Sequence, residues 1–342
     1  MNGACIDVLR TRRSLDDAGL RYLLCTDDRD TVRALHAAAR EETDSRFGRV
    51  VWLRALIEWS SVCRNDCLYC GIRRSNRAVR RYTMRPDEIL SCCERAWDAG
   101  LRTFVLQGGE NPAAAEGLAP VVAGIRAAWP DAAITLSLGE LPPETYALLR
   151  RNGADRFLLR HETADPAHYA RLHPAGMTLE GRLACLRALR SLGYQVGMGM
   201  MVGSPSQTED ALLADLRLLA SFRPEMVGIG PFIPQQDTPL GTFPPGSADR
   251  TLRLYSLVRL MLPDALIPST TALSTLLPDG WRAGLAAGAN VIMPDFTPAE
   301  YRGEYALYEG KAASGIALSV LIEKLAAAGY RIGAGRGDYN GN

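Results

Sequence analysis

The chain has 342 residues, of which 47% are hydrophobic and 23% are charged, a composition typical of a globular protein with a large core. Its formal net charge of +1 gives no electrostatic reason to expect nucleic acid or a membrane surface as a partner. We find no run of about 20 apolar residues that would predict a membrane span, and no N-terminal apolar segment of signal-peptide length. These features favour a cytoplasmic protein, whose eight cysteines stay reduced and act as ligands or core residues.

Residues 1–48 have a helical pattern and are expected to form an N-terminal helical extension. After them, short apolar runs alternate with amphipathic segments. Two of these segments, 85–99 and 178–192, end just before a glycine, and Thr208 is expected to cap a third helix. The expected strands are 52–59, 103–107, 133–138, 156–160, 195–202, 226–230, 266–270 and 290–293.

Eight strand–helix repeats predict an α/β fold, specifically a closed parallel (β/α)8 barrel of the TIM type. An open doubly wound sheet is the alternative. We expect three parts: the helical extension 1–48, the barrel 49–310, and a C-terminal helix and tail 311–342 that close the barrel. The glycine-rich residues from 333 onward are expected to be frayed. In such a barrel, active-site groups lie at the C-terminal ends of the strands.

The first strand leads into CRNDCLYC, residues 63–70, which places three cysteines in a C-x3-C-x2-C pattern. Structural zinc usually takes four protein ligands, whereas soft thiolates also select copper(I) and iron–sulfur clusters. A 4Fe-4S cluster normally takes four cysteines. Three cysteines would leave one iron open to a substrate or cofactor. Zinc, or three unrelated thiols in a loop, is the alternative interpretation.

The cysteine loop, with Tyr69 before its third cysteine, resembles the signature of the radical S-adenosylmethionine (SAM) superfamily. Further segments, LQGGENP, TLSLGE, DRFLLRHETADP, MVGIGPFIPQQDTPL, IPSTTA and ANVIMPDFTP, resemble the HydE-type FeFe-hydrogenase maturases. The resemblance covers about residues 50–310. It implies a radical SAM enzyme with one 4Fe-4S cluster and SAM as cofactors.

The resemblance also assigns roles to residues. It implies that the cluster ligands are Cys63, Cys67 and Cys70. The SAM-binding residues would be Tyr69, Gln107, Gly109, Glu110, Ser137, Glu162, Arg182 and Met201, with Glu162 on the amino group and Arg182 on the carboxylate. The inner cavity that holds the substrate would be lined by Arg54, Arg160, Thr270, Thr271, Met293, Tyr301 and Tyr305.

In the family that the sequence resembles, a 5′-deoxyadenosyl radical acts on a cysteine-bound Fe(CO)2(CN) precursor of the hydrogenase H-cluster. The resemblance therefore implies an organometallic or amino-acid-derived substrate, an electron donor such as ferredoxin or flavodoxin, and other hydrogenase maturases as partners. The alternatives are a carbon-skeleton mutase similar to methylornithine synthase, a sulfur donor similar to biotin synthase, and a non-enzymatic iron–sulfur carrier.

Two positions depart from the family pattern. Gly108 stands where members often have serine, so a hydroxyl contact is lost there. Residues 310–314 contain no cysteine, and none follows Cys185, so a second cluster is not expected.

Other residues are interpreted from their position alone. Cys92 and Cys93 are expected in the core, because they lie on or beside the apolar face of a helix. Arg160 ends an apolar strand, which favours a functional role. The orientation of His161 and the role of the basic segment 73–81 are left open. The alternating glycines 197, 199, 228 and 230 could admit a cofactor or simply narrow the barrel.

Overall fold

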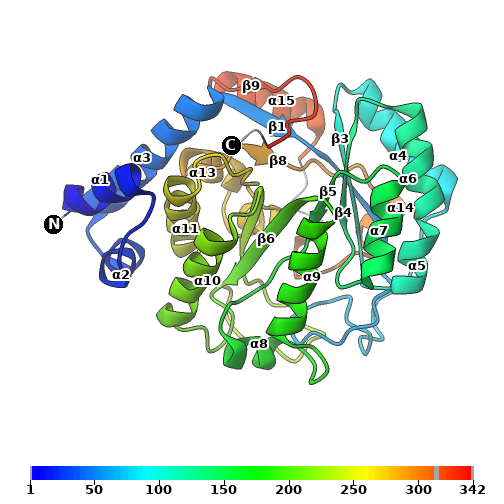
Figure 1. The fold of residues 1–342 in the computed structure, drawn as a ribbon, viewed down its shortest axis with the longest axis horizontal. Coiled ribbons are helices and arrows are strands. Elements are labelled where there is room, and N and C mark those ends of the chain that lie inside the picture. The colour runs from blue at the N-terminus through cyan, green and yellow to red at the C-terminus, as the bar shows by residue number, and fades with distance from the viewer. Residues whose placement is uncertain (1, 312–315, 340–342) are drawn as a thin grey trace.

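The computed structural model describes residues 2–311 and 316–339. Three helices come first, α1 (Asn2–Arg12), α2 (Asp17–Cys25) and α3 (Arg29–Phe47), and α3 packs against α11 (Ala248–Met261). Figure 1 shows these helices beside the strand-containing body. The segment 310–314, for which the sequence predicts no second cluster, lies partly outside the described residues.

Six parallel strands form one sheet in the order β2–β3–β4–β5–β6–β7. The helices between and after them lie around this sheet (Figure 1). Most strand residues are buried, as expected for parallel strands that are covered on both faces. The strands are β2 (Ala55–Ser60), β3 (Thr103–Gly108), β4 (Ala133–Ser137), β5 (Arg156–Leu158), β6 (Gln195–Val202) and β7 (Met226–Pro231). The helices are α4 (Pro86–Asp98), α5 (Pro112–Gly117), α6 (Ala119–Ala128), α7 (Pro143–Arg151), α8 (Pro166–Leu172), α9 (Leu179–Ser191) and α10 (Glu209–Phe222).

A second, three-stranded sheet has the order β8–β1–β9, with β1 at Val50–Leu53, β8 at Val291–Ile292 and β9 at Arg331–Ile332. Isolated parallel bridges extend from β7 toward it, Met226 to Leu266 and Pro268 to Val291, and another joins Leu56 to Asp295. The remaining helices are α12 (Thr271–Leu276), α13 (Gly280–Ala286), α14 (Ala299–Arg302) and α15 (Leu318–Ala327). The structure is thus an α/β fold with a parallel sheet, and closure into a regular eight-stranded barrel stays a prediction.

Apart from shifted ends and the added strand β9, the strands differ from the sequence prediction at two places. The expected strand 52–59 is divided at Arg54 into β1 and β2, and these belong to different sheets. The expected strand 266–270 is wrong as a continuous strand, because its pairing is limited to isolated bridges at Leu266 and Pro268. Proline has no N–H group to donate to a ladder, so Pro268 interrupts the pairing.

The C-terminal tail is packed rather than frayed through residue 338. Its strand β9 pairs with β1, and a Cβ atom on Gly333 or Gly337 would meet the Trp52 ring at 2.2 and 2.7 Å respectively. Asp338 forms an ion pair with Arg156 at 2.6 Å. The prediction of fraying is therefore wrong for this segment, because close packing on Trp52 and Arg156 fixes it.

Several local predictions are confirmed. Thr208 caps α10, with its side chain accepting a hydrogen bond from the Ala211 N–H. Cys92 and Cys93 on α4 are buried in the hydrophobic core. In the part of the chain that the structure describes, no helix combines the length and apolar character needed to cross a membrane.

Candidate active site

The cysteine loop follows β2 and is tied by its backbone to three distant segments. The Arg64 N–H donates to the Glu110 carbonyl at 2.8 Å, and the Leu68 N–H donates to the Leu172 carbonyl at 2.8 Å. The Gly71 N–H donates to the Leu307 carbonyl, also at 2.8 Å. These bonds join the loop to segments after β3, in α8 and after α14, and they hold the three thiols at one end of the sheet.

The three thiols are free, partly exposed and close enough to influence one another. Burial raises the pKa of Cys63, of Cys67 and of Cys70, the last to about 12. Negative charge on neighbouring thiolates raises the pKa further, from Cys70 and Cys63 in the case of Cys67. Without metal these thiols keep their protons, so cluster binding must release protons and is favoured by higher pH.

The three cysteines of the loop form a donor set of soft thiolates. Among the described residues, no three histidine, cysteine or acidic side chains lie close enough to bind one ion together. In a 4Fe-4S cluster, Cys63, Cys67 and Cys70 would each bind one iron. Soft thiolate donors are also the ligands that iron–sulfur clusters take.

Glu162 has an unusual backbone and a carboxylate oxygen available to a ligand. Its φ is 66°, a left-handed conformation that is uncommon outside glycine. Its Oε2 atom lies 3.1 Å from Nη2 of Arg160 and accepts no hydrogen bond from a described residue. A buried carboxylate oxygen with this unused capacity fits the ammonium group of SAM.

Arg182 on α9 is almost fully buried and is fixed by two acceptors. Its Nε atom donates to Oε1 of Glu140, and its Nη1 atom donates to the Arg160 carbonyl, both at 2.6 Å. A guanidinium carries five N–H donors, so Arg182 can keep these two bonds and still bind a ligand carboxylate.

Most predicted site residues surround one cavity of about 310 Å³, which we call the main cavity. It brings together residues from the cysteine loop and from the ends of β3 to β7, together with residues that follow Pro268 and β8. Cys67 lies beside its two partner cysteines, close enough for their charges to act on it. The predicted residues that line the main cavity are Cys63, Tyr69, Cys70, Gln107, Gly109, Glu110, Ser137, Arg160, Glu162, Arg182, Met201, Thr270, Thr271, Met293 and Tyr305.

Two residues that were expected to line this cavity lie elsewhere. Arg54 is buried where β1 and β2 meet, with its guanidinium 3.1 Å from Met226 Sδ and 3.4 Å from the Gly337 carbonyl, near the C-terminal tail. Tyr301 on α14 donates to Oε1 of Glu88 at 3.0 Å and stacks on Tyr82. The expectation that they line the cavity is corrected, because Arg54 lies between β1 and β2 beside the C-terminal tail and Tyr301 packs against Tyr82 and α4.

Glycine at position 108 is explained by the packing of Trp59. A Cβ atom on Gly108 would lie 2.5 Å from Nε1 of the Trp59 ring, so a serine there would require the ring to move. The alternating glycines divide into two groups. Gly228 and Gly230 line the main cavity, whereas a Cβ on Gly199 would meet the Gly228 carbonyl oxygen at 1.9 Å.

Three residues of the main cavity with polar or charged side chains were missed in the sequence: Glu58, Tyr308 and Lys311. Glu58 is the charged residue within the apolar strand segment ALIEWS, and that contrast could have revealed it. Lys311 and Tyr308 follow α14 in a segment without regular periodicity, so no sequence pattern placed them at the site.

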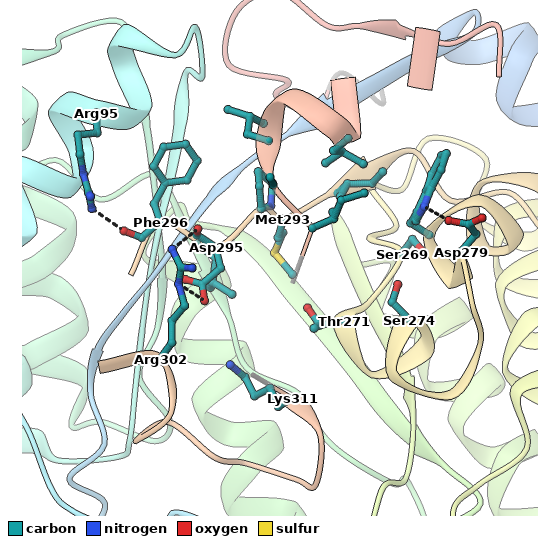
Figure 2. A pocket seen from close by; sticks show the side chains of 18 residues that line it. Arg95, Ser269, Thr271, Ser274, Asp279, Met293, Asp295, Phe296, Arg302 and Lys311 are labelled. Carbon is teal, nitrogen blue, oxygen red and sulfur yellow. Dashed lines mark hydrogen bonds and ion pairs between the residues drawn. The ribbon is translucent and has the colours of Figure 1, made fainter. Parts of the chain in front are cut away.

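A second cavity of about 650 Å³, the side cavity, adjoins the main cavity and contains none of the three loop cysteines among its lining residues. Figure 2 shows its walls, including the Arg302–Asp295 and Trp281–Asp279 contacts. Four residues line both cavities: Leu56, Thr271, Met293 and Lys311.

Comparison with known proteins agrees with this geometry. The model of the radical SAM superfamily matches residues 57–219. The methylornithine synthase PylB has the same fold, with a TM-score of 0.85, 27% identity and coverage of 96% of this chain and 97% of that one. The structure of the maturase HydG from Carboxydothermus hydrogenoformans has a TM-score of 0.82 at 20% identity, covering 97% and 79% of the two chains, which shows a shared fold.

The fold and the site define a radical SAM enzyme, and enzymes of this superfamily use a 4Fe-4S cluster and SAM. The chain is 46% identical over 301 residues to the [FeFe] hydrogenase maturase subunit HydE of Thermotoga maritima, covering 88% of this chain and 86% of the relative. It therefore belongs to the HydE family of radical SAM proteins. It is also 32% identical over 286 residues to the 3-methylornithine synthase of Methanosarcina barkeri, covering 83% and 80% of the two chains.

Proposed function

We propose that this enzyme is a HydE-type maturase that acts on a cysteine-bound Fe(CO)2(CN) precursor during assembly of the hydrogenase H-cluster. The observation that carries the proposal is the main cavity, which places two of the loop cysteines, Glu162 and Arg182 around one space. The 46% identity to the maturase subunit HydE supports the narrower assignment.

When bound, the cluster and SAM supply a 5′-deoxyadenosyl radical. The protein residues hold the reactants and exclude water from them. Cys63, Cys67 and Cys70 would bind three irons, and Glu162 and Arg182 would bind the amino and carboxylate groups of SAM. The other proposed SAM contacts are Tyr69, Gln107, Gly109, Glu110, Ser137 and Met201.

The substrate would occupy the part of the main cavity lined by Arg160, Thr270, Thr271, Met293 and Tyr305. Arg160 supplies a positive charge there that suits an anionic iron complex. The same guanidinium also pairs with Glu162, whose Oε2 atom lies 3.1 Å from Nη2 of Arg160. The closed (β/α)8 barrel of residues 49–310, covered by residues 1–48 and 311–342, is part of this proposal.

An acidic electron donor such as ferredoxin or flavodoxin would approach the cysteine loop from its basic side. Arg74, Arg77 and Arg80 are exposed on the segment that follows Cys70. Arg74 and Arg80 keep 70% and 67% of their side-chain surface exposed despite contacts with Asp66 and Glu304. Exposed arginines beside a redox centre would speed association with an acidic protein, an effect that added salt reduces.

A mutase similar to methylornithine synthase is the second candidate, because 3-methylornithine synthase of Methanosarcina barkeri is 32% identical to this chain. The two functions share radical SAM activity, which is tested on reduced, cluster-reconstituted protein, and they differ in their products. Release of 5′-deoxyadenosine from SAM tests the radical SAM activity, and its absence would overturn both candidates. Restoration of hydrogenase activity in a host lacking HydE supports the maturase, whereas formation of 3-methylornithine supports the mutase.

A further inference from the structure

Glu58 and Lys311 form an ion pair in the wall of the main cavity. The Lys311 Nζ atom lies 2.5 Å from Oε1 of Glu58, and the two side chains are 9% and 0% exposed. Within residues 2–311 and 316–339, no group donates a hydrogen bond to Oε2 of Glu58. A buried carboxylate usually has its capacity filled, so this oxygen marks a place where a ligand can bind.

The partner of Glu58 is a lysine in a chain whose basic residues are almost all arginines. Of the 39 basic residues, Lys311 and Lys324 are the two lysines. A lysine ends in a primary ammonium group, a compact charge with three donors, whereas arginine ends in a wide planar fork. The ammonium of Lys311 therefore has the size, charge and donors of the amino group of an amino acid.

Lys311 also lies where its side chain has space to move. It lines both the main cavity and the side cavity, together with Leu56, Thr271 and Met293. Figure 2 shows Lys311 among the residues that line the side cavity. Because lysine has a flexible four-carbon stem, rotation about that stem can take its ammonium out of the main cavity without a backbone change.

We propose that Glu58 binds an ammonium group of the substrate, and that Lys311 occupies this position until the substrate displaces it toward the side cavity. The amine site rests on the proposed function, because it assumes that the substrate reacts in the main cavity. The ligand class that it implies is a primary amine, such as the amino group of an amino-acid-derived substrate.

The environment of Glu58 supports this exchange. Burial raises the pKa of Glu58 to about 7, against the opposing charge of Lys311, and the charges of Asp295 and Arg302 also act on it. A carboxylate with this pKa is ionised at pH 8 and gains from a cationic partner in a site of low dielectric. Loss of Lys311 without replacement by another cation would leave the carboxylate buried and unpaired.

The test measures ligand binding to the full-length, cluster-reconstituted protein with SAM present, by titration calorimetry at pH 8. The probes are S-methyl-L-cysteine and 3-(methylthio)propionate, which differ in the amino group and lack a free thiol. We expect Lys311→Met to bind S-methyl-L-cysteine at least about tenfold more tightly than the wild type, because the competing ammonium is gone. We expect Glu58→Gln to bind it at least about tenfold more weakly.

Lys324→Met is the matched control, since Lys324 forms a surface ion pair with Asp279 and should leave both affinities unchanged. The amine-free probe should show neither effect. Equal or weaker binding of S-methyl-L-cysteine to Lys311→Met would overturn the proposal, and so would equal gains for both probes. If Glu58→Gln does not fold, the change in affinity of Lys311→Met for S-methyl-L-cysteine still tests the proposal. Release of 5′-deoxyadenosine by the wild type, measured separately, tests the proposed function independently of the amine site.

Discussion

His161 and Asp215 form a buried pair that holds the segment on both sides of Glu162. Their Nε2 and Oδ1 atoms are 3.0 Å apart, and neither side chain is exposed. The same Oδ1 atom accepts a hydrogen bond from the Ala164 N–H at 2.5 Å. Asp215 on α10 thus bonds the residue before Glu162 and the second residue after it, and Glu162 between them has a left-handed conformation.

Asp215→Asn is therefore expected to weaken SAM binding. A non-glycine residue with positive φ costs on the order of 1–3 kcal/mol and persists when its surroundings fix it. When the contacts of Asp215 with His161 and Ala164 are weakened, Glu162 can move away from the ammonium of SAM. The Kd for SAM should then rise about tenfold. Equilibrium dialysis of SAM with the reconstituted protein measures this change. Asp210→Asn, on the same helix but exposed in an ion pair with Arg21, is the control and should bind SAM normally.

The effect on SAM is separable from a general loss of stability. If Asp215→Asn lowers the free energy of unfolding but leaves the Kd for SAM unchanged, Asp215 supports the fold and does not position Glu162.

The sequence left the orientation of His161 open, because its partner lies on a helix 54 positions further along the chain. A contact of this kind depends on packing and has no local pattern.

Features that depend on neighbouring residues were predictable from the sequence. The strand at Gln195–Val202 and the cap at Thr208 agree with the prediction, because strand formation in an apolar run and capping by a threonine are local effects. The spacing of the three cysteines indicated a metal or cluster site, and the resemblance to the radical SAM signature indicated which kind. The division at Arg54 and the interruption at Pro268 were not predicted, because they depend on pairing between distant segments and not on local β-propensity.

Contacts between the ends of the chain were not predictable. The Glu58–Lys311 pair joins an early strand to a late segment without periodicity, and the tail packs on Trp52 through glycines that in the sequence suggested fraying. In both cases the partner is chosen by the fold. Composition describes the segment itself and says nothing of the surface that it meets.

Cys67→Ala is expected to abolish cluster binding and SAM cleavage. With two thiolates left, the cluster loses one of its three protein ligands. Iron content per chain and 5′-deoxyadenosine release should both fall to background. The control is Cys25→Ala, because Cys25 lies at the end of α2, far along the chain from the cysteine loop. Full iron content in Cys67→Ala would contradict the ligand assignment.

The stability of the protein should depend on the ionisation of Glu58. Burial raises its pKa from 4.5 to about 7. The folded state therefore holds this proton more tightly than the unfolded state. The resulting stabilisation is fully present below pH 4.5 and is lost as the pH rises through about 7. At about 1.4 kcal/mol for each pKa unit, the loss is on the order of 3 kcal/mol.

The Glu58→Gln variant has no titrating group at this position. Comparing it with the wild type therefore isolates the pH dependence that Glu58 causes from that of the other carboxylates. The free energy of unfolding of the wild type, minus that of the variant, should decrease by about 3 kcal/mol between pH 4.5 and pH 8. Urea unfolding of the SAM-free proteins at several pH values measures it. A difference that stays constant with pH would show that Glu58 titrates near its usual value.

Asp338→Ala is expected to destabilise the protein although it lies close to the C-terminus. Asp338 pairs with Arg156, whose side chain is fully buried at the start of β5, and the Arg156 Nη2 atom also donates to the Arg336 carbonyl at 2.9 Å. Removing one partner of a buried ion pair leaves an uncompensated charge, which costs about 3 kcal/mol. Thermal unfolding of wild type and variant measures the loss. Asp264→Ala is the control, because Asp264 pairs with Arg46, which is 42% exposed. Equal melting temperatures for Asp338→Ala and the wild type would mean that the tail does not contribute to the stability of the sheet.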